Sequence, residues 1–77
     1  MTRDELLRLV AKALGQDVVA DDAEMGATRG WDSIVQVHLL LAIEEAVGVE
    51  IPPDMFGTLT SLAKIDAFLK DSGALSG

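Results

Sequence analysis

Residues 30–48 read GWDSIVQVHLLLAIEEAVG and predict the longest helix of the chain. Between Ser33 and Val47 there is no Gly or Pro, and Gly48 stands where a residue in the left-handed conformation would end a helix. We expect about four helical turns over this stretch. At about 100° per residue, one arc of the helix is apolar and predicts the side that faces the core: Leu39, Leu40, Ile43 and Val47.

A second arc of the same predicted helix is also largely apolar, with a histidine and a carboxylate at its edge: Ile34, Val37, His38, Leu41 and Glu45. A small domain does not need to bury two sides of one helix, so we expect this arc to face solvent and to bind a partner. The alternative is that Val37 and Leu41 belong to the core, because apolar side chains of this kind are usually buried.

Two adjacent residues are able to cap the start of this helix. Ser33 and Gln36 fit the S-x-x-Q capping box, which is the ordinary structural interpretation. Asp32 is an equally good N-cap, and if it caps the helix, the Ser33 hydroxyl is free for other chemistry. The unpaired N–H groups and positive dipole of a helix N-terminus favour a phosphoester at this position. His38, the only histidine, lies more than one turn away, so Ser33 has no base beside it and is expected to be modified by another enzyme.

The remainder of the chain predicts two further long helices and one short one. The first helix begins at a capping box formed by Thr2 and Glu5 and ends at Gly15. The last helix begins at Thr60 or Ser61. Their spacing predicts core-facing residues: Leu7, Val10, Ala11 and Leu14 in the first helix, and Leu62, Ile65, Phe68 and Leu69 in the last.

Residues 49–53 contain two prolines and are expected to form an extended linker with Val49 and Ile51 turned inward. Asp54 is predicted to cap a short turn through residues 55–56, and residues 72–77 are expected to fray. The fold class is therefore all-α, a small four-helix bundle of three longer helices and one short helix, with a long loop between the first two.

That loop, residues 15–31, is longer than most connections in a compact domain. We expect its apolar residues to pack it onto the helices: Val18, Val19, Met25 and Trp31. A calcium site at Asp21, Asp22 and Glu24 is the alternative, but the glycine and the distal glutamate of an EF-hand loop are missing. A solvated acidic surface, with no metal site, is the preferred interpretation.

The composition limits the classes of function. The 77 residues predict one domain, residues 1–77, with a stability of about 3–5 kcal/mol. Because 13 acidic side chains oppose 6 basic ones, the formal charge is −7, which disfavours nucleic acid and favours partners with basic patches. There is no cysteine, no apolar run of membrane length and no charged-then-apolar leader, so we expect a monomeric cytoplasmic protein.

Several residues together carry a family resemblance. Asp32-Ser33-Ile34, followed by Glu44-Glu45 and by VGVEIP at residues 47–52, resembles the acyl carrier protein family, with its D-S-L motif and its L-E-E-x-F-G-I-x-I-P-like segment. About twenty residues match at the right spacing, and the length and layout of the rest of the chain also agree. The resemblance therefore covers essentially all of the chain.

The resemblance implies a 4′-phosphopantetheine arm joined to Ser33 by a phosphodiester and added by a separate phosphopantetheinyl transferase. The thiol of the arm would carry acyl groups as thioesters to acyl-loading and acyl-processing enzymes of the acyltransferase, ketosynthase or adenylation type. The protein would then be a carrier with no catalytic residue. Asp32 matches the acidic residue that assists the transferase and its magnesium ion in the family, and a purely capping role is the alternative.

Two departures from the family bear on partners and pathway. Carriers of primary fatty acid biosynthesis usually have acidic residues where this chain has Val35 and His38, so we expect docking to depend on apolar contact through Ile34, Val35, Val37 and Leu41. This favours polyketide or related specialised biosynthesis. The alternatives are an aminoacyl or peptidyl carrier of a nonribosomal pathway and an unmodified helical adaptor that uses the Ile34/Val37/Leu41 face. A hydrolase on Ser33 lacks a base.

Trp31, the only tryptophan, stands two residues before Ser33. It is expected either to pack the loop onto the bundle or to contact the arm or a partner.

Overall fold

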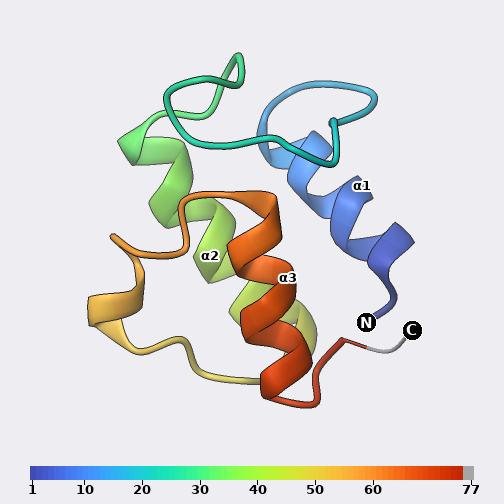
Figure 1. Cartoon of the computed structure of the whole chain (residues 1–77), viewed down its shortest axis with the longest axis vertical. Helices are drawn as coiled ribbons and strands as arrows, with labels where there is room; N and C mark the ends of the chain where they lie inside the picture. The colour runs from blue at the N-terminus through green and yellow to red at the C-terminus, as the bar shows by residue number, and fades with distance from the viewer. Residues whose placement is uncertain (76–77) are drawn as a thin grey trace.

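The structure is a computed structural model in which residues 1–75 are described. They form three α-helices and one 3-10 turn, labelled in Figure 1 where there is room: α1 (Arg3–Ala13), α2 (Ser33–Val47), η1 (Pro53–Met55) and α3 (Leu62–Asp71). Within residues 1–75 no strand is formed, and the predicted all-α class with a long loop between the first two long helices is confirmed.

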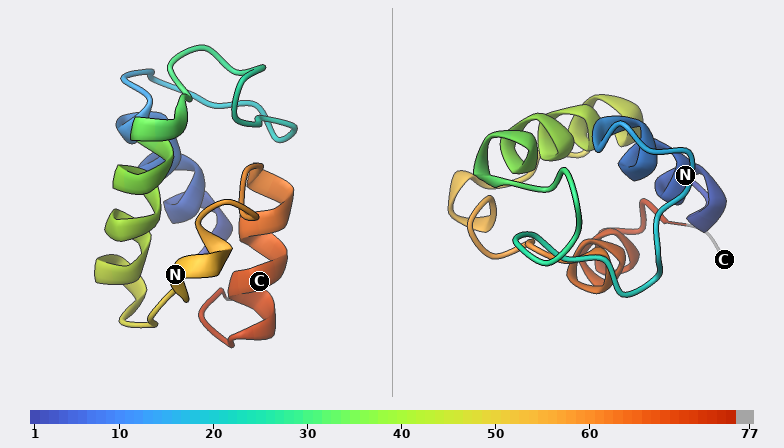
Figure 2. Two further views of the ribbon diagram at one scale, coloured as in Figure 1. Left: turned by 90° about the vertical axis from the view of Figure 1, so that its left-hand side faces the viewer. Right: turned by 90° about the horizontal axis from the view of Figure 1, so that it is seen from above.

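The three helices surround one core. The helices α1 and α2 lie side by side and run in opposite directions, while α3 lies across the core from them and runs in the same direction as α2 (Figures 1 and 2). The long loop crosses the end of the molecule at which α2 and α3 begin (Figure 2). The N-terminus of α2 is therefore at the end of the bundle that the loop covers.

The predicted starts of the other two long helices are confirmed. At α1, the Glu5 N–H donates to Thr2 Oγ1 at 3.2 Å and the Thr2 N–H donates to Glu5 Oε1 at 2.9 Å, which completes the capping box. At α3, Ser61 is the cap, and its Oγ accepts from the Lys64 N–H at 3.2 Å. These contacts satisfy N–H groups that have no partner inside the helix.

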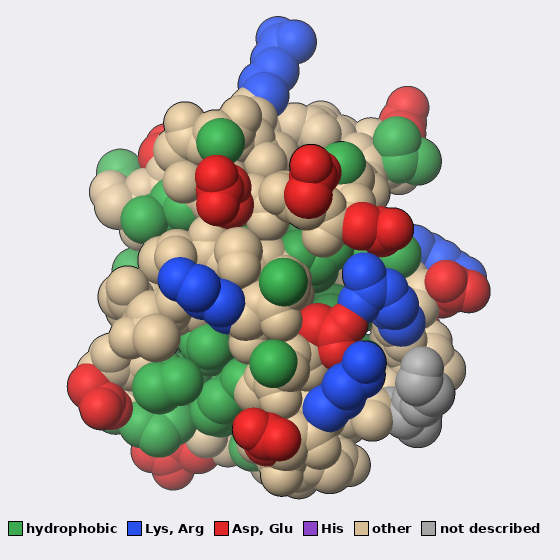
Figure 3. All heavy atoms as spheres, viewed as in Figure 1, with side chains coloured by type: hydrophobic (Ala, Val, Ile, Leu, Met, Phe, Trp, Pro, Cys, Tyr) green, Lys and Arg blue, Asp and Glu red, His purple; other side chains and the backbone are tan. Residues whose placement is uncertain are grey.

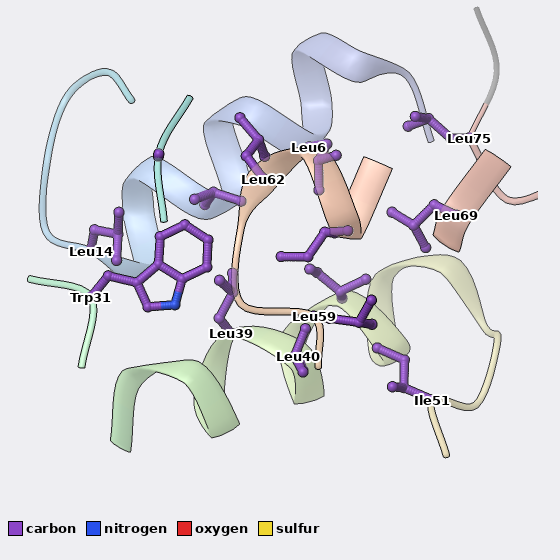
Figure 4. Close-up of a cluster of buried hydrophobic side chains, with 14 residues drawn as sticks. Leu6, Leu14, Trp31, Leu39, Leu40, Ile51, Leu59, Leu62, Leu69 and Leu75 are labelled. Atoms are coloured by element: carbon purple, nitrogen blue, oxygen red, sulfur yellow. The ribbon is translucent and has the colours of Figure 1, made fainter. Parts of the chain in front are cut away.

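Buried apolar side chains from all three helices, the loop and the linker make one core, shown in Figure 4. Its members include Leu6, Val10, Leu14, Trp31, Leu39, Leu40, Ile43, Ile51, Leu59, Leu62, Ile65, Leu69 and Leu75. The core prediction for α1 was wrong at one position, because Leu6 is fully buried and Leu7 lies at the edge. Residues 6 and 7 are both leucines, so the spacing alone fits either choice.

Other core predictions hold only in part. Val47, Val49 and Phe68 are half-buried rather than buried. The chain after α3 does not fray up to residue 75, because Leu75 is only 8 % exposed and its N–H donates to Leu69 O at 3.2 Å. The rest of that prediction, for residues 76–77, lies outside the described residues.

The long loop is packed by three of the four residues expected, and Val18 is the exception. Val18 is 80 % exposed, which contradicts its predicted role, and Val19 and Met25 are half-buried. Ala23 takes a core position instead, and its carbonyl accepts from the Leu62 N–H at 2.9 Å. The Met25 N–H donates to Thr60 O at 2.8 Å, so backbone hydrogen bonds as well as apolar side chains attach the loop to the start of α3.

The short turn begins two residues earlier than expected. Pro53 opens η1, and the Asp54 side chain makes no capping hydrogen bond, which contradicts the predicted cap. A proline is well suited to the first position of a helical turn, because its missing N–H would have no partner there and its φ is already close to the helical value.

An ion-pair group that the sequence reasoning missed joins the start of α1, the loop and α3. The Arg3 guanidinium contacts the carboxylates of Asp66 and Asp21, and Lys70 Nζ lies 3.2 Å from Asp66 Oδ1. Figure 3 shows Lys and Arg side chains beside acidic ones on this face, and a separate group of hydrophobic side chains between η1 and α3. The spacing of Asp66 and Lys70, one helical turn apart, was the available signal.

None of the described helices is both long enough and apolar enough to span a bilayer.

Candidate functional site at the start of helix α2

The first turn of α2 is capped by Asp32. This residue has extended backbone angles, and its Oδ1 accepts from the N–H groups of Ile34 at 3.0 Å and Val35 at 2.8 Å. The helix itself begins at Ser33. The Asp32 cap is therefore confirmed, and the competing capping box between Ser33 and Gln36 is wrong.

Gln36 lies in the core instead, only 3 % exposed. The indole N–H of Trp31 donates to Gln36 Oε1 at 2.6 Å, and Gln36 Nε2 donates to the carbonyls of Phe56 at 3.0 Å and Leu59 at 2.6 Å. One amide thus ties the start of α2 to the long loop and to the segment after η1. Sequence reasoning assigned Gln36 only to a cap. The missed signal was its spacing from Leu39, Leu40 and Ile43, which puts it on the core-facing arc.

Ser33 is exposed, and no described residue makes a hydrogen bond with its hydroxyl. It is the first residue of a 15-residue helix, where the macrodipole is positive. Because Asp32 already caps the helix, the fold does not use the Ser33 hydroxyl. A phosphoester on this oxygen would meet the favourable electrostatics of a helix N-terminus and would displace no structural contact.

The second arc of α2 faces solvent, as predicted. Ile34 is 68 % exposed, Val37 42 % and Leu41 49 %, and His38 and Glu45 are also exposed. The alternative that placed Val37 and Leu41 in the core is therefore wrong. These residues form an uncovered apolar strip that begins one residue after Ser33, and exposed apolar strips of this kind mark sites of protein contact.

Two residues predicted to face a partner lie elsewhere. Trp31 is only 2 % exposed, and Figure 4 shows its indole pointing into the core between Leu14 and Leu39. Its packing role is the one that the structure supports. Val35 is half-buried against the core and so belongs only partly to the exposed strip.

Glu44 also has a structural role that was not foreseen. Its Oε2 accepts from the Ile51 N–H at 2.6 Å, and it thereby holds the linker against the end of α2. A carboxylate so engaged contributes less to a docking surface than the exposed Glu45. No trio of His, Cys, Asp or Glu side chains within residues 1–75 is arranged to hold a metal ion, so the calcium alternative at Asp21, Asp22 and Glu24 gains no support.

Comparison with known proteins places the chain in a family. The family model described as "Phosphopantetheine attachment site" matches residues 4–69, which is most of the chain. The chain belongs to this family of carrier proteins. It is also 28 % identical over 71 residues to the acyl carrier protein of Helicobacter pylori (strain G27), a match that covers 90 % of this chain and 91 % of that protein. No solved structure gives a significant match.

Family membership confirms several predictions. The protein is a carrier rather than an enzyme, it resembles acyl carrier proteins over most of its length, and its prosthetic group is 4′-phosphopantetheine. Carriers of this kind interact with a phosphopantetheinyl transferase and with acyl-processing enzymes. The unmodified adaptor and the hydrolase are therefore set aside.

Proposed function

We propose that this chain is an acyl carrier whose 4′-phosphopantetheine arm is attached to Ser33 Oγ and that it serves polyketide or related specialised biosynthesis. The observation that carries the attachment site is that the Ser33 hydroxyl is exposed and unused by the fold. It is exposed at the N-terminus of α2, and none of residues 1–75 uses it in a hydrogen bond. Residues 1–77 act as one carrier domain, supported by a core that extends from Leu6 to Leu75.

The first turn of α2 suits this attachment. A phosphodiester on Ser33 would carry its negative charge next to the positive end of the helix dipole, which favours an anion there. The Asp32 carboxylate would be a second negative charge nearby, but two N–H groups already hydrogen-bond to its Oδ1. The second oxygen of Asp32, Oδ2, has no role in the cap and is available to assist the transferase and its magnesium ion.

Partners dock on the exposed strip formed by Ile34, Val37 and Leu41, with His38 and Glu45 at its edge. Apolar side chains dominate this strip, so contact burial rather than long-range attraction supplies most of the affinity. The rate of arm transfer by a phosphopantetheinyl transferase should therefore change little between low and moderate ionic strength. A steep fall in kcat/KM as salt is added would contradict this mode of docking.

Intact mass spectrometry after incubation with coenzyme A, magnesium and a broad-specificity phosphopantetheinyl transferase tests the attachment site. The wild-type chain should gain the mass of one arm, and Ser33→Ala should gain none. Ser61→Ala is the matched control, because Ser61 is also a serine at the start of a helix, and this variant should still be loaded. Circular dichroism checks that each variant is folded. Arm transfer to Ser33→Ala would overturn the assignment.

Acyl cargo is favoured over the aminoacyl or peptidyl alternative by the acyl carrier relative from Helicobacter pylori. The mass of the group released from the carrier isolated from its own cells distinguishes these cargoes. A released amino acid or peptide would contradict the acyl assignment and leave the attachment at Ser33 intact.

A further inference from the structure

The long loop holds its most exposed apolar side chain beside a small groove on α1. Val18 is 80 % exposed, more than any other large hydrophobic side chain of residues 1–75. It lines a groove with a volume of about 140 Å³ together with Leu7, Arg8, Asp17 and Val19, and we call these five residues the α1–loop face. Leu7 and Val19 are half-buried against the core, so the floor of the groove is apolar.

The volume of this groove indicates the kind of occupant that fits it. Small-molecule sites measure roughly 300–1,000 Å³, so the groove is too small for a ligand of that class. A cavity of about 150 Å³ is able to hold one benzene ring. The groove therefore accommodates one apolar side chain that projects from the surface of another protein.

The charge of the loop indicates the sign of the partner. Residues 15–28 contain four carboxylates and no lysine or arginine, in a chain whose net charge is −7. The carboxylates are those of Asp17, Asp21, Asp22 and Glu24. Asp21 pairs with Arg3, whereas the other three are exposed and make no ion pair within residues 1–75. Lysine and arginine side chains of a partner are therefore attracted to this segment.

These carboxylates are close enough to Val18 to act together with it. Asp17 directly precedes Val18, and Asp22 follows it by four residues, so the Cα atoms of residues 18 and 22 are at most about 14 Å apart. Arg8, on α1, is the only cation that lines the groove. A partner that fits the α1–loop face thus has an apolar side chain in the middle and cations on the side that meets the loop.

The α1–loop face is separate from the exposed strip of α2. None of the residues that line its groove belongs to α2. The long loop nevertheless crosses the end of the molecule at which α2 begins (Figure 2). A partner bound to the loop is therefore near the end of the bundle that has Ser33, and it leaves Val37 and Leu41 free for another contact.

We infer that the α1–loop face is a second docking surface, for a protein that presents one apolar side chain surrounded by lysine and arginine residues. The apolar side chain enters the groove over Leu7 and Val19 and contacts Val18, while the cations face Asp17 and the following carboxylates. This inference goes beyond the proposed function and does not depend on the attachment at Ser33.

The contact is weak and depends on salt. A groove that holds one side chain buries far less than the roughly 1,200–2,000 Å² of a stable interface, so the complex forms and dissociates readily. Attraction between exposed charges is screened beyond about 10 Å at about 0.1 M salt. Docking on the α1–loop face should therefore weaken as salt is added, in contrast to docking on the apolar strip of α2.

The experiment titrates a basic peptide into the isotope-labelled full chain and follows the amide chemical shifts. The probe is Lys-Lys-Arg-Leu-Arg-Lys-Lys, blocked at both ends. The signals of Leu7, Val18 and Val19 should move most, and the dissociation constant should rise about fivefold or more from about 20 mM to about 200 mM sodium chloride. A peptide with serine in place of the leucine should bind more weakly, and one with glutamate at every basic position should not bind.

Val18→Ser should weaken binding of the leucine peptide about fivefold or more, because it removes the apolar contact. Val37→Ser is the matched control, since Val37 is an exposed valine of the α2 strip and does not line the groove. Asp22→Asn should weaken binding about threefold at low salt and have little effect at high salt. Asp71→Asn removes an exposed carboxylate at the end of α3 and should have no effect.

Several results would overturn the inference: largest shifts at Leu41 and Phe56, equal binding of the serine peptide, no dependence on salt, or no binding. Signals of Leu7 and Val18 that change with the concentration of the chain alone would identify a second copy as the occupant and would also overturn it. Ser33→Ala should bind the peptide as the wild type does. Failure of the wild-type chain to gain an arm would therefore overturn the attachment site and leave this inference intact.

Discussion

The buried side-chain amide of Gln36 hydrogen-bonds to Trp31, Phe56 and Leu59. Replacing it with leucine keeps a similar size but removes the partners of the Trp31 N–H and of the Phe56 and Leu59 carbonyls. A buried polar group left without a partner costs about 1–3 kcal/mol. We expect Gln36→Leu to lower the free energy of unfolding by about 2–4 kcal/mol, measured by urea denaturation followed by circular dichroism.

Gln16→Leu is the comparison for that change. Gln16 also hydrogen-bonds through its side chain, to Arg29 O, but at an exposed place where water is able to replace it. It should cost about 1 kcal/mol or less. Equal losses in the two variants would show that burial of the amide near Trp31 is not what stabilises this end of the bundle.

Gly30 connects the loop to α2 in a place without room for a side chain. Its φ is +85°, and a Cβ built there would lie 2.8 Å from the Leu14 backbone oxygen. Gly26 has a similar φ of +87° but open space around it. Gly26→Ala should cost about 1 kcal/mol from backbone strain alone, and Gly30→Ala about 1–3 kcal/mol more because the α1 C-terminus must move. Thermal unfolding measures both, and equal costs would contradict the close approach.

At the scale of the helix, the capping box of α1 makes its stability depend on pH. The backbone N–H of Thr2 and its hydroxyl hold the pKa of the Glu5 carboxyl below its usual value. The folded pKa is therefore lower than the unfolded pKa. The stabilisation is fully present above the unfolded pKa and is lost as the pH falls through the folded pKa.

Glu5→Gln isolates this contribution, because glutamine keeps the capping hydrogen bond without a titrating charge. Wild type should lose stability relative to Glu5→Gln when urea unfolding is repeated from neutral pH down to the acid range in which carboxyl groups titrate. A difference between the two proteins that stays constant with pH would contradict the role of the ionised carboxylate.

Helix α2 has one apolar side in the core and a second apolar side exposed to solvent. Leu41→Gln changes the exposed strip, and leucine and glutamine have similar helix propensities, so stability should stay within about 0.5 kcal/mol. If Leu41 anchors the transferase, kcat/KM for arm transfer should fall about fivefold or more. Ala46→Gln changes another exposed position of α2 and should leave the rate unchanged.

The helices could be predicted from the sequence because caps and periodicity act locally. Asp32, Ser61 and the pair of Thr2 and Glu5 fix three helix starts through contacts that span at most three residues. The serine at the start of α2 was identified for the same reason. The spacing of Gln36 indicates a core-facing position, but its partners could not be predicted, because Phe56 and Leu59 are far along the chain and only the folded structure brings them together.

At the scale of the whole molecule, a core this small depends on residues at its edges. Leu75 lies after α3 and is 8 % exposed, so Leu75→Ala should lower the free energy of unfolding by about 2 kcal/mol. Val18→Ala removes methyl groups from a side chain that is 80 % exposed and should change stability by less than about 0.5 kcal/mol. Urea denaturation measures both, and similar effects would contradict the packing of Leu75.

Local patterns could not predict that Ala23 rather than Val18 is buried in the long loop. Val18 and Ala23 are both apolar, yet the larger side chain faces solvent and the smaller one is buried. The Ala23 carbonyl accepts from the Leu62 N–H, and this contact between distant parts of the chain holds residue 23 beside the start of α3. The same limit applies to Asp66, whose partner Arg3 lies at the other end of the chain.

The enclosed indole of Trp31 has a practical consequence. It is the chain's single strong near-ultraviolet fluorophore, and it stands two residues before Ser33 and hydrogen-bonds to Gln36 on the following turn. Emission wavelength and quantum yield respond to the polarity around an indole, so any loosening of the loop when the serine is modified or a partner arrives should be visible without a dye. The fluorescence of Trp31 should thus report on the start of α2, where we propose that the arm is attached.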